Sequence, residues 1–498
     1  MGVVIRQGVK SGIVNFIGVA LGMLINLFVF PKIFTLAEIG VLGVLLALMV
    51  IVAPIAQMGF PSVLIKYFPA FNHNRRMFGS LLFVSFAVIA LMSVLMFLSI
   101  LFFREQVVDY YSKQSSLVGK YLFLVLPLII GQAYMGVLDA YCATRLRISI
   151  PTFIREILIR ALWLGGAFAV MRGALTFQYF ILIYTSSYLV AFIFQLCYAI
   201  WQGMPFCISL AYLTENKDIR KQLNYGFALM LQGFLNCLYG NMDIVLVGAM
   251  LGDKPAGIYV LTTRITSLIL IPQRVIAQIM NPLITEAWYH RRMKRIQKLF
   301  EDSWRNLLWV GLAMLLVIWL SIDDIIASNP AKFEQIKWLV LIGGIAKLID
   351  VASGINTEVM CNTAFYHEHT VMLIGMEVTT LVLGLALIPQ YGLMGAAGIF
   401  LFSVLAFNFT KLFYLKRKAN LSPFVPSGLR VLLAALVAYG ITWLATASLT
   451  GAGLLWWVSA GIKAVVFGVL YLAGLLLLKA SPELNSIWNM VKGKIKTA

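Results

Sequence analysis

The sequence predicts an all-α integral membrane protein with about 14 transmembrane helices, in two pseudo-symmetric six-helix lobes plus two C-terminal helices. The hydropathy, the spacing of apolar windows and a weak internal repeat support this prediction. Of 498 residues, 61% are hydrophobic and 12% are charged, and the mean hydropathy is +0.91. A soluble globule of this length needs far more polar surface. Most of the chain is therefore expected to lie in a bilayer.

Apolar windows recur along the chain between short polar breaks. A helix needs roughly 20 apolar residues to cross the hydrocarbon core. The windows are too long for barrel strands, and continuous helices satisfy their own backbone groups. The 14 predicted spans are 11–30, 39–58, 78–103, 118–139, 152–171, 177–200, 223–250, 258–281, 305–322, 336–357, 370–388, 392–414, 428–449 and 453–478.

The widest break between spans, 201–222, mixes apolar and charged residues and is expected to form a cytoplasmic interfacial linker. A weak repeat flanks it: Asn15 aligns with Gln232 and Asn26 with Asp243, at the same offset of 217. Paired halves of this kind are common in transporters. The predicted parts are an N-terminal lobe (1–200), the linker (201–222), a C-terminal lobe (223–415), two additional helices (427–480) and a cytoplasmic tail (481–498).

Lysine and arginine are unevenly distributed, and this explains most of the net charge of +19. With the N-terminus inside, the cytoplasmic segments hold 22 of these residues and the outer segments hold six. The protein is expected in the cell (plasma or inner) membrane. The positive-inside rule then places both termini and 289–298 on the cytoplasmic side and 104–116 on the outer side. The basic run at 289–298 suits anionic lipid, so no nucleic-acid partner is expected.

Other kinds of site have little support in the sequence. The five cysteines are odd in number, form no CxxC motif and lie in or beside spans, so neither a disulfide framework nor a zinc site is indicated. The longest predicted outer loop, 104–116, contains no histidine. An enzyme, a bound metal and a cofactor are therefore not expected, and no catalytic residue is assigned.

The span 258–281 carries two arginines, Arg264 and Arg274. At about 100° per residue, Ser267 and Gln278 share one face of this helix with them. Each guanidinium would cost roughly 2.5–3.5 kcal/mol facing lipid. Both arginines are therefore expected to face a wet interior, as cations that bind a substrate.

The span 152–171 carries two more arginines, Arg155 and Arg160. Arg155 lies within a turn of the cytoplasmic interface and is expected to extend its side chain to the surface. Arg160 lies about 13 Å deeper than Pro151 along the helix axis. It is expected to be a third cation of the same interior.

Three other spans each place polar residues on one face, which predicts a common polar cavity. These faces are Asn15, Gly18, Gly22 and Asn26; Gln232, Asn236, Tyr239 and Asp243; and Lys347, Asp350, Gly354 and Glu358. Lys347 and Asp350 are spaced for an internal ion pair, so they either neutralise each other or take part in ion coupling. Asp243, Asp139 and Glu377 either bind a coupling ion or pair with the arginines.

Two stretches, DIVLVGAMLGDKPAGIYVLTTRI at 243–265 and IPQYGLMGAAGIF at 388–400, together with the twelve-plus-two helix count, resemble the polysaccharide flippases of the multidrug/oligosaccharidyl-lipid/polysaccharide exporter superfamily. The resemblance covers nearly the whole chain. It implies transfer of a polyprenyl-pyrophosphate-linked oligosaccharide to the outer leaflet by alternating access. In the related lipid II flippases, the last two of fourteen helices form a groove for the lipid tail. Arg264 and Arg274 match the general position of the family's cavity cations, whereas no motif covers Arg160.

The chemistry suits that substrate. A pyrophosphate needs multi-donor cations, which guanidinium supplies, and sugar hydroxyls need Asn, Gln, Ser and Tyr. The glycan is expected to be an O-antigen, capsule or exopolysaccharide unit. Lipid II flipping and cation-coupled drug export remain the alternatives. A monomer in the bilayer is expected, driven by a proton or sodium gradient if transport is coupled, and association with other polysaccharide-assembly proteins stays open.

Overall fold

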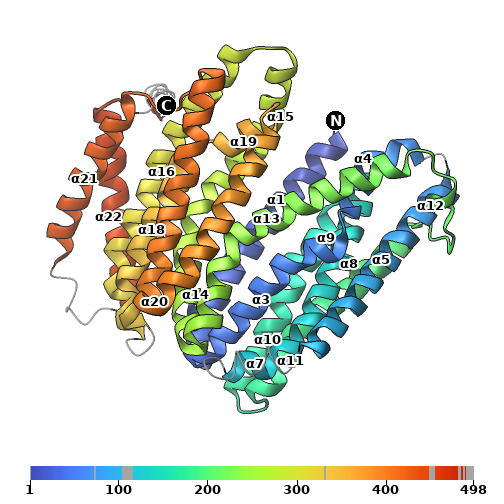
Figure 1. Ribbon diagram of the computed structural model, residues 1–498. Helices are drawn as coiled ribbons and strands as arrows, with labels where there is room; N and C mark the ends of the chain where they lie inside the picture. Colours follow the sequence, from blue (N-terminus) through green and yellow to red (C-terminus); the bar gives the residue numbers. More distant parts are fainter. Residues whose placement is uncertain are drawn as a thin grey trace. The chain divides into compact units, whose positions relative to one another are not determined.

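The computed structural model is helical and contains no strand in the residues that it describes, which confirms the all-α prediction (Figure 1). These residues are 2–71, 74–103, 116–329, 333–447, 455–480, 484, 485 and 488. The predicted loop 104–116 and tail 481–498 lie largely outside them. The longer helices are α1 (Gly2–Leu24), α3 (Leu36–Gln57), α5 (Arg75–Phe102), α8 (Val125–Thr144), α10 (Ile159–Met171), α11 (Phe177–Trp201), α13 (Ile219–Leu251), α14 (Asp253–Thr266), α15 (Ile271–Tyr289), α16 (Met293–Ser328), α18 (Lys337–Ala352), α20 (Tyr366–Ala419), α21 (Ser427–Thr446) and α22 (Trp456–Leu477).

Short helices and single turns join these elements. They are η1 (Ile25–Val29), α2 (Phe30–Ile33), α4 (Phe60–Phe71), α7 (Ser116–Tyr121), η2 (Leu122–Leu124), α9 (Ser149–Phe153), η3 (Ile154–Leu158), α12 (Ala211–Thr214), η4 (Ser267–Leu270), η5 (Glu334–Ile336) and α19 (Asn356–Cys361). Two of the turns, η1 and η3, are π turns, and η4 is a 3₁₀ turn.

Eleven helices of the described part are long and apolar enough to cross a membrane. They cover twelve of the 14 predicted spans, because α20 contains two of these and is broken at Gly392, where φ is +60° and ψ is −140°. A side chain at this φ would be strained, so glycine suits the break. The remaining predicted spans are the helical stretch α9–η3–α10 and helix α18. The protein is therefore a multi-pass membrane protein.

Local sequence signals set several helix ends. Thr35 caps α3 reciprocally: its hydroxyl accepts from the Glu38 amide at 3.3 Å, and its own amide donates to the Glu38 carboxylate at 2.8 Å. Asn74 caps α5 by accepting from the Met77 amide at 3.0 Å. α13 ends at Gly252, whose φ of +102° favours glycine.

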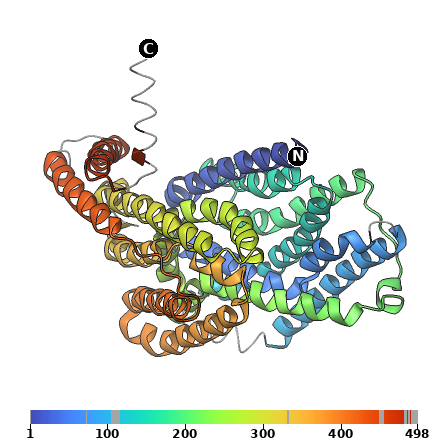
Figure 2. The ribbon, with the colours of Figure 1, turned by 90° about the horizontal axis from the view of Figure 1, so that it is seen from above.

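Residues 1–260 form the first of two compact units. Its central helix, α8, packs against α3, α4, α5 and α11. α1 packs along α9 and η3, and Figure 2 shows the start of the chain beside this segment. α13 packs against α3 and so belongs to this unit. Helices α1, α10 and α11 each contact η3, and α11 also packs against α8.

Residues 261–498 form the second unit. α16 packs against α18, α21 and α22, and Figure 1 shows the last two helices side by side. The apolar core between α16, α21 and α22 includes Trp304, Val431, Phe467 and Tyr471. A second cluster joins α15, α16 and α19 to α20.

Several helical segments extend past the apolar windows. α16 begins at Met293, before the predicted span 305–322, and it buries Ile296 and Phe300 in its early turns. Lysine, arginine and glutamate favour helix in water as well as in the membrane, so hydropathy gives no signal for such extensions. α4, a short helix after α3, was also not predicted. The boundary between the compact units falls inside α14, and the predicted lobes 1–200 and 223–415 remain predictions.

Candidate functional site

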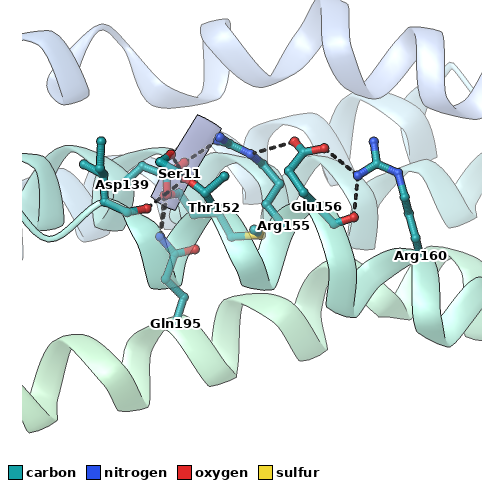
Figure 3. Close-up of polar contacts among 9 residues, drawn as sticks. Ser11, Asp139, Thr152, Arg155, Glu156, Arg160 and Gln195 are labelled. Atoms are coloured by element: carbon teal, nitrogen blue, oxygen red, sulfur yellow. Dashed lines mark hydrogen bonds and ion pairs between the residues drawn. The ribbon is translucent and has the colours of Figure 1, made fainter. Parts of the chain in front are cut away.

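Four charged side chains of alternating sign form a chain in the first unit (Figure 3). The Asp139 carboxylate accepts from Gln195 Nε2 at 2.7 Å and from Arg155 Nη1 at 2.5 Å. Arg155 Nε lies 3.5 Å from the Glu156 carboxylate. Arg160 Nη1 donates to the same carboxylate at 2.5 Å and to the Glu156 carbonyl oxygen at 2.5 Å. We call Asp139, Arg155, Glu156 and Arg160 the charge chain.

Different helices supply the members of the charge chain. Asp139 lies on α8, Arg155 and Glu156 on the π turn η3, and Arg160 in the first turn of α10. A π turn closes with i→i+5 bonds and often marks a functional site. Because it holds more residues than an α-helical turn, it changes which side chains share a face. Here it allows Arg155 to point to α8 while Arg160 points to α1.

Two glycines of α1 leave room for the Arg160 guanidinium. A Cβ added at Gly22 would lie 2.6 Å from Arg160 Nε, and one at Gly18 would lie 3.0 Å from Arg160 Nη1. Further towards the N-terminus of α1, the Ser11 hydroxyl lies 3.0 Å from the hydroxyl of Thr152 on α9. The predicted polar face of the first span thus contains a groove of small residues filled by an arginine.

The charge chain is partly buried and electrically balanced. The exposed fractions of the Glu156, Arg160, Asp139 and Arg155 side chains are 15%, 20%, 25% and 38%. An unpaired charge at such a depth carries a desolvation penalty of several kcal/mol, which the alternating signs offset. Both guanidinium groups remain partly exposed.

The structure adds a partner to each of the predictions for Arg155 and Arg160. Arg155 donates to Asp139 on a neighbouring helix, and its side chain is 38% exposed. Arg160 is paired with Glu156 rather than isolated. The spacing of these two residues, i and i+4, is a sequence signal for an ion pair. The Asp139 contact joins two helices, and no local pattern predicts it.

The polar faces of the first and seventh spans are only partly directed inward. Asn15 is exposed, and Asn26 donates to the Gly22 carbonyl of its own helix at 2.7 Å. On α13, the exposed Asn236 donates to the Gln232 carbonyl at 2.9 Å. The Asn26 and Asn236 amides are thus satisfied by the backbone of their own helices.

Further along α13, the Asp243 carboxylate is hydrogen-bonded to a neighbouring helix. Its carboxylate accepts from the Tyr259 hydroxyl of α14 at 2.8 Å and from the Ile244 amide at 2.9 Å. Tyr239, one turn earlier on α13, is half-buried. The Asp243–Tyr259 bond ties the end of α13 to α14 within the first unit.

Arg264 and Arg274 belong to the second unit and do not share one continuous stripe. The 3₁₀ turn η4 separates them, and four residues at 120° instead of 100° rotate the later residues by about 80°. Arg264 is half-buried, and its Nε is buried with no hydrogen-bond partner among the described residues. Arg274 is exposed.

The other polar residues of the predicted stripe divide in the same way. Ser267 is half-buried, and its hydroxyl donates to the Arg264 carbonyl at 2.9 Å. Gln278 is exposed, one turn after Arg274. The uniform helical wheel used for the sequence prediction is therefore wrong across η4.

The predicted coupling residues of the second unit occupy separate surroundings. Asp350 accepts from Asn408 Nδ2 at 3.1 Å. Lys347 Nζ lies 4.4 Å from the centre of the Phe400 ring. Glu377 is 5% exposed. Among the described residues, no group of three or more His, Cys, Asp and Glu side chains is placed to hold a metal ion.

Two buried lysines of the second unit were missed in the sequence. Lys411 is 1% exposed and Lys463 is 4% exposed, both inside predicted spans. A lysine in an apolar window is itself the signal. Lys411 lies close to the end of its span, where an interfacial position is the ordinary expectation, whereas Lys463 lies well inside its own.

Comparison with solved structures shows the fold. The structure titled "Lipid II flippase MurJ, inward closed conformation" matches with a TM-score of 0.73 and 12% identity, covering 94% of this chain and 98% of that one. An inward-facing multidrug resistance MATE family transporter of the MOP superfamily matches with a TM-score of 0.68 and 11% identity, covering 81% and 93%. A MOP superfamily transporter from Pyrococcus furiosus gives 0.56 and 11%, covering 84% and 95%.

Sequence comparison shows the family. No curated protein sequence matches the chain. The family model described as "Polysaccharide biosynthesis protein" matches residues 8–289, which is more than half of the 498 residues. The match includes the whole charge chain, Arg264 and Arg274. With a fold shared with MOP superfamily transporters, the chain belongs to the polysaccharide biosynthesis protein family.

Proposed function

We propose that the protein is a flippase that moves a polyprenyl-pyrophosphate-linked oligosaccharide from the cytoplasmic to the outer leaflet by alternating access. The observation that carries the proposal is the charge chain, in which two guanidinium groups of the predicted span 152–171 are bonded to the protein's own carboxylates. Membership of a polysaccharide biosynthesis family supports a glycan-linked substrate. The MOP transporter fold supports a transporter rather than an enzyme.

The Asp139 and Glu156 carboxylates occupy positions that phosphate oxygens would take. Guanidinium binds phosphate and carboxylate with the same planar fork. A pyrophosphate that reaches Arg160 competes with Glu156 for Nη1, and its release lets the ion pair form again. This exchange keeps the arginine neutralised in the empty protein, so that an unpaired charge is not left in the membrane.

Arg264 and Arg274 are proposed as further cations for the same substrate. The buried Nε of Arg264, which has no hydrogen-bond partner among the described residues, is a donor ready for an anion. The hydroxyl and amide groups of Asn15, Asn26, Gln232, Asn236, Tyr239, Ser267 and Gln278 are proposed contacts for the sugar. The glycan is proposed to be an O-antigen, capsule or exopolysaccharide unit, and lipid II is the alternative because of the fold shared with a lipid II flippase.

Transport is proposed to use a proton or sodium gradient. Asp243 and Asp350 are the leading acids because each is hydrogen-bonded inside the protein, to Tyr259 and Asn408. Lys347 and Glu377 are proposed as groups that modulate them. Gradient dependence in membrane vesicles should change in Asp243→Asn or Asp350→Asn. If both variants kept the gradient dependence of the wild type, these two acids would have no role in coupling.

The proposed orientation has both termini in the cytoplasm, and it rests on the positive-inside bias of the sequence. The division into lobes 1–200 and 223–415 is proposed from the weak internal repeat. A cysteine introduced by Arg291→Cys in a cysteine-free background should resist an impermeant reagent added to intact cells. Labelling from outside would reverse the assignment.

The substrate is tested by depleting the protein and analysing the lipid-linked glycans. Under the proposal, a complete polyprenyl-pyrophosphate oligosaccharide accumulates in the cytoplasmic leaflet and surface polysaccharide falls. Accumulation of lipid II with normal surface polysaccharide would select the alternative substrate. If neither lipid accumulates, the flippase assignment fails.

A further inference from the structure

A cavity of about 210 Å³ lies in the second unit, where the end of α16, the start of α18, the end of α21 and the start of α22 meet. The basic residues at the start of α16 lie at the opposite end of that helix, so the proposed orientation puts the cavity on the outer side. Three aromatic and three charged side chains are among those that line it: Trp319, Tyr439 and Trp443, and Asp323, Lys337 and Lys463.

The charged groups of the cavity are held in ion pairs. Lys337 Nζ donates to the Asp323 carboxylate at 2.6 Å, and both side chains are partly exposed. Lys463 Nζ donates to the Asp324 carboxylate at 2.7 Å, and both of these side chains are almost completely buried. Each ammonium therefore has its own carboxylate, and these four charges sum to zero.

The buried pair favours a neutral ligand. The Asp324 carboxylate also accepts from the Ser459 hydroxyl at 2.9 Å. If Lys463 turned away to an anion in the cavity, Asp324 would become a buried carboxylate without its cation. Glu156 of the charge chain differs, because Arg155 lies 3.5 Å away and would remain beside it. A cation that enters the cavity would likewise have to displace an ammonium group.

The same groups can still bind a ligand with hydroxyls. An ammonium has three N–H donors, and among the described residues the bond to Asp324 engages one donor of Lys463. Lys337 and the Tyr439 hydroxyl add donors, and the Asp323 carboxylate adds acceptors. Since a hydroxyl group both donates and accepts, a polyol can use all of these groups without a change in charge.

The aromatic rings give the cavity an apolar wall. The centre of the Trp319 ring lies 5.8 Å from Lys337 Nζ and 5.9 Å from the centre of the Trp338 ring. Trp443, on α21, is 57% exposed. An aromatic ring is apolar and has an electron-rich face, whereas a pyranose carries C–H groups on its faces and hydroxyls around its edge. Rings beside hydrogen-bonding groups therefore suit a sugar.

The volume of the cavity limits the size of the ligand. Sites for drug-sized molecules usually measure about 300–1,000 Å³, and this cavity is smaller, at about 210 Å³. It suits one monosaccharide unit rather than a whole oligosaccharide.

We propose that this cavity is a binding site for one neutral monosaccharide unit. Trp319 and Trp443 contact the faces of the sugar ring, and Lys463, Lys337 and Asp323 bind its hydroxyls. The site is separate from the charge chain of the first unit. The sugar is part of the transported glycan after it has reached the outer side. This source of the sugar rests on the proposed function, whereas binding of the sugar itself does not.

Saturation-transfer NMR of the purified full-length protein tests the binding. The protein is held in phosphatidylcholine nanodiscs, so that no detergent with a sugar headgroup is present. The probes are glucose, galactose, N-acetylglucosamine and rhamnose, added singly, and glycerophosphoethanolamine represents a lipid headgroup. At least one sugar should receive saturation from the protein. Trp443→Leu should weaken its binding by up to about tenfold, because one aromatic contact is lost.

Trp457→Leu is the matched control for Trp443→Leu. Trp457 lies in the same unit, is also 57% exposed and is not among the residues that line the cavity. It should retain wild-type binding, which separates a cavity contact from the general enrichment of tryptophan at membrane interfaces.

Asp323→Asn combined with Lys337→Met tests the polar side of the cavity. Both side chains are partly exposed and the double change leaves neither charge unpaired, so the variant should fold. Sugar binding should weaken by about tenfold or more, because charged hydrogen bonds are lost. Thermal unfolding checks that the variant is folded.

Saturation of none of the four sugars, or equal binding by wild type and Trp443→Leu, would overturn the proposal. Saturation of glycerophosphoethanolamine alone, with loss in Trp443→Leu, would also overturn it, because the cavity would then bind a phospholipid headgroup.

Export distinguishes the sources of the sugar. A fall in surface polysaccharide in Trp443→Leu at normal abundance, with normal export by Trp457→Leu, would support the transported glycan as the source. Normal export by a Trp443→Leu protein that has lost sugar binding would keep the sugar site but overturn its link to transport. Because the NMR measurement uses free sugars, its result stands even if depletion of the protein shows that it is not a flippase.

Discussion

Arg160 holds Glu156 twice across one turn of the same helical segment: its Nη1 donates to the Glu156 carboxylate and to the Glu156 carbonyl oxygen, each at 2.5 Å. The guanidinium is thereby fixed against α1 with its charge neutralised. Such a pair has two explanations. It either stabilises the fold, or it keeps a substrate-binding cation in place until an anion replaces the carboxylate.

A charge exchange separates these two explanations. Glu156→Arg combined with Arg160→Glu preserves the net charge and one i,i+4 pair. If position 160 binds a phosphate, this double variant should accumulate normally while export falls about tenfold or more, since a charged hydrogen bond contributes about 1.5–3 kcal/mol. Surface polysaccharide and protein abundance are measured together.

Arg160→Lys is the matched control for the exchange. It keeps the charge but loses the planar fork, so partial export is expected. Full export by the exchanged variant at normal abundance would show that the pair is only structural.

Gly22 tests the same guanidinium from the opposite helix. In Gly22→Ala the new Cβ would lie 2.6 Å from Arg160 Nε, so the arginine must move. Export is expected to fall several-fold with little change in abundance, because a flexible side chain can yield. Gly12→Ala is the control on α1, since nothing lies within 4 Å of its Cβ. An equal loss in both variants would point to a general effect on α1.

Sequence patterns placed twelve of the 14 predicted spans on helices that are long and apolar enough to cross a membrane, because an apolar window of about 20 residues has few other uses. They also placed Gly18, Gly22 and Arg160 in the polar interior, and the structure brings these three together. The Glu156–Arg160 pair was readable from its spacing. The pairing of Arg155 with Asp139 was not, because it depends on how α8 packs beside η3.

Irregular turns account for other differences. A helical wheel assumes a constant 100° per residue, and the π turn η3 and the 3₁₀ turn η4 break that assumption. Arg264 and Arg274 therefore differ in burial although a regular helix would align them. Pro272 follows η4 and has no amide hydrogen for the carbonyl four residues earlier, so the sequence does mark this break, whereas the composition of η3 does not mark the π turn.

Lys463 of α22 and Asp324 of α16 form a buried ion pair at 2.7 Å, with Ser459 donating to the same carboxylate at 2.9 Å. Removing one partner, as in Lys463→Met, leaves an unpaired buried charge and should destabilise the protein by about 3–5 kcal/mol. Lys463→Met combined with Asp324→Leu should recover most of the loss. Thermal unfolding in detergent measures both. Equal damage in the single and double variants would contradict a role for pairing.

Arg264 and Arg274 give the final test of the proposed function. Because Arg264 Nε is buried without a hydrogen-bond partner among the described residues, Arg264→Met removes a charge that is costly to the empty protein. Its abundance should be normal or higher while surface polysaccharide disappears. Arg274 is exposed, so Arg274→Ala should leave abundance unchanged and also abolish export. Arg→Lys at either position should restore export only in part, since the bidentate contact is lost. If export continued normally in the double variant Arg264→Ala with Arg274→Ala at normal abundance, these arginines would not bind the substrate, and the charge chain of the first unit would have to supply the cations alone.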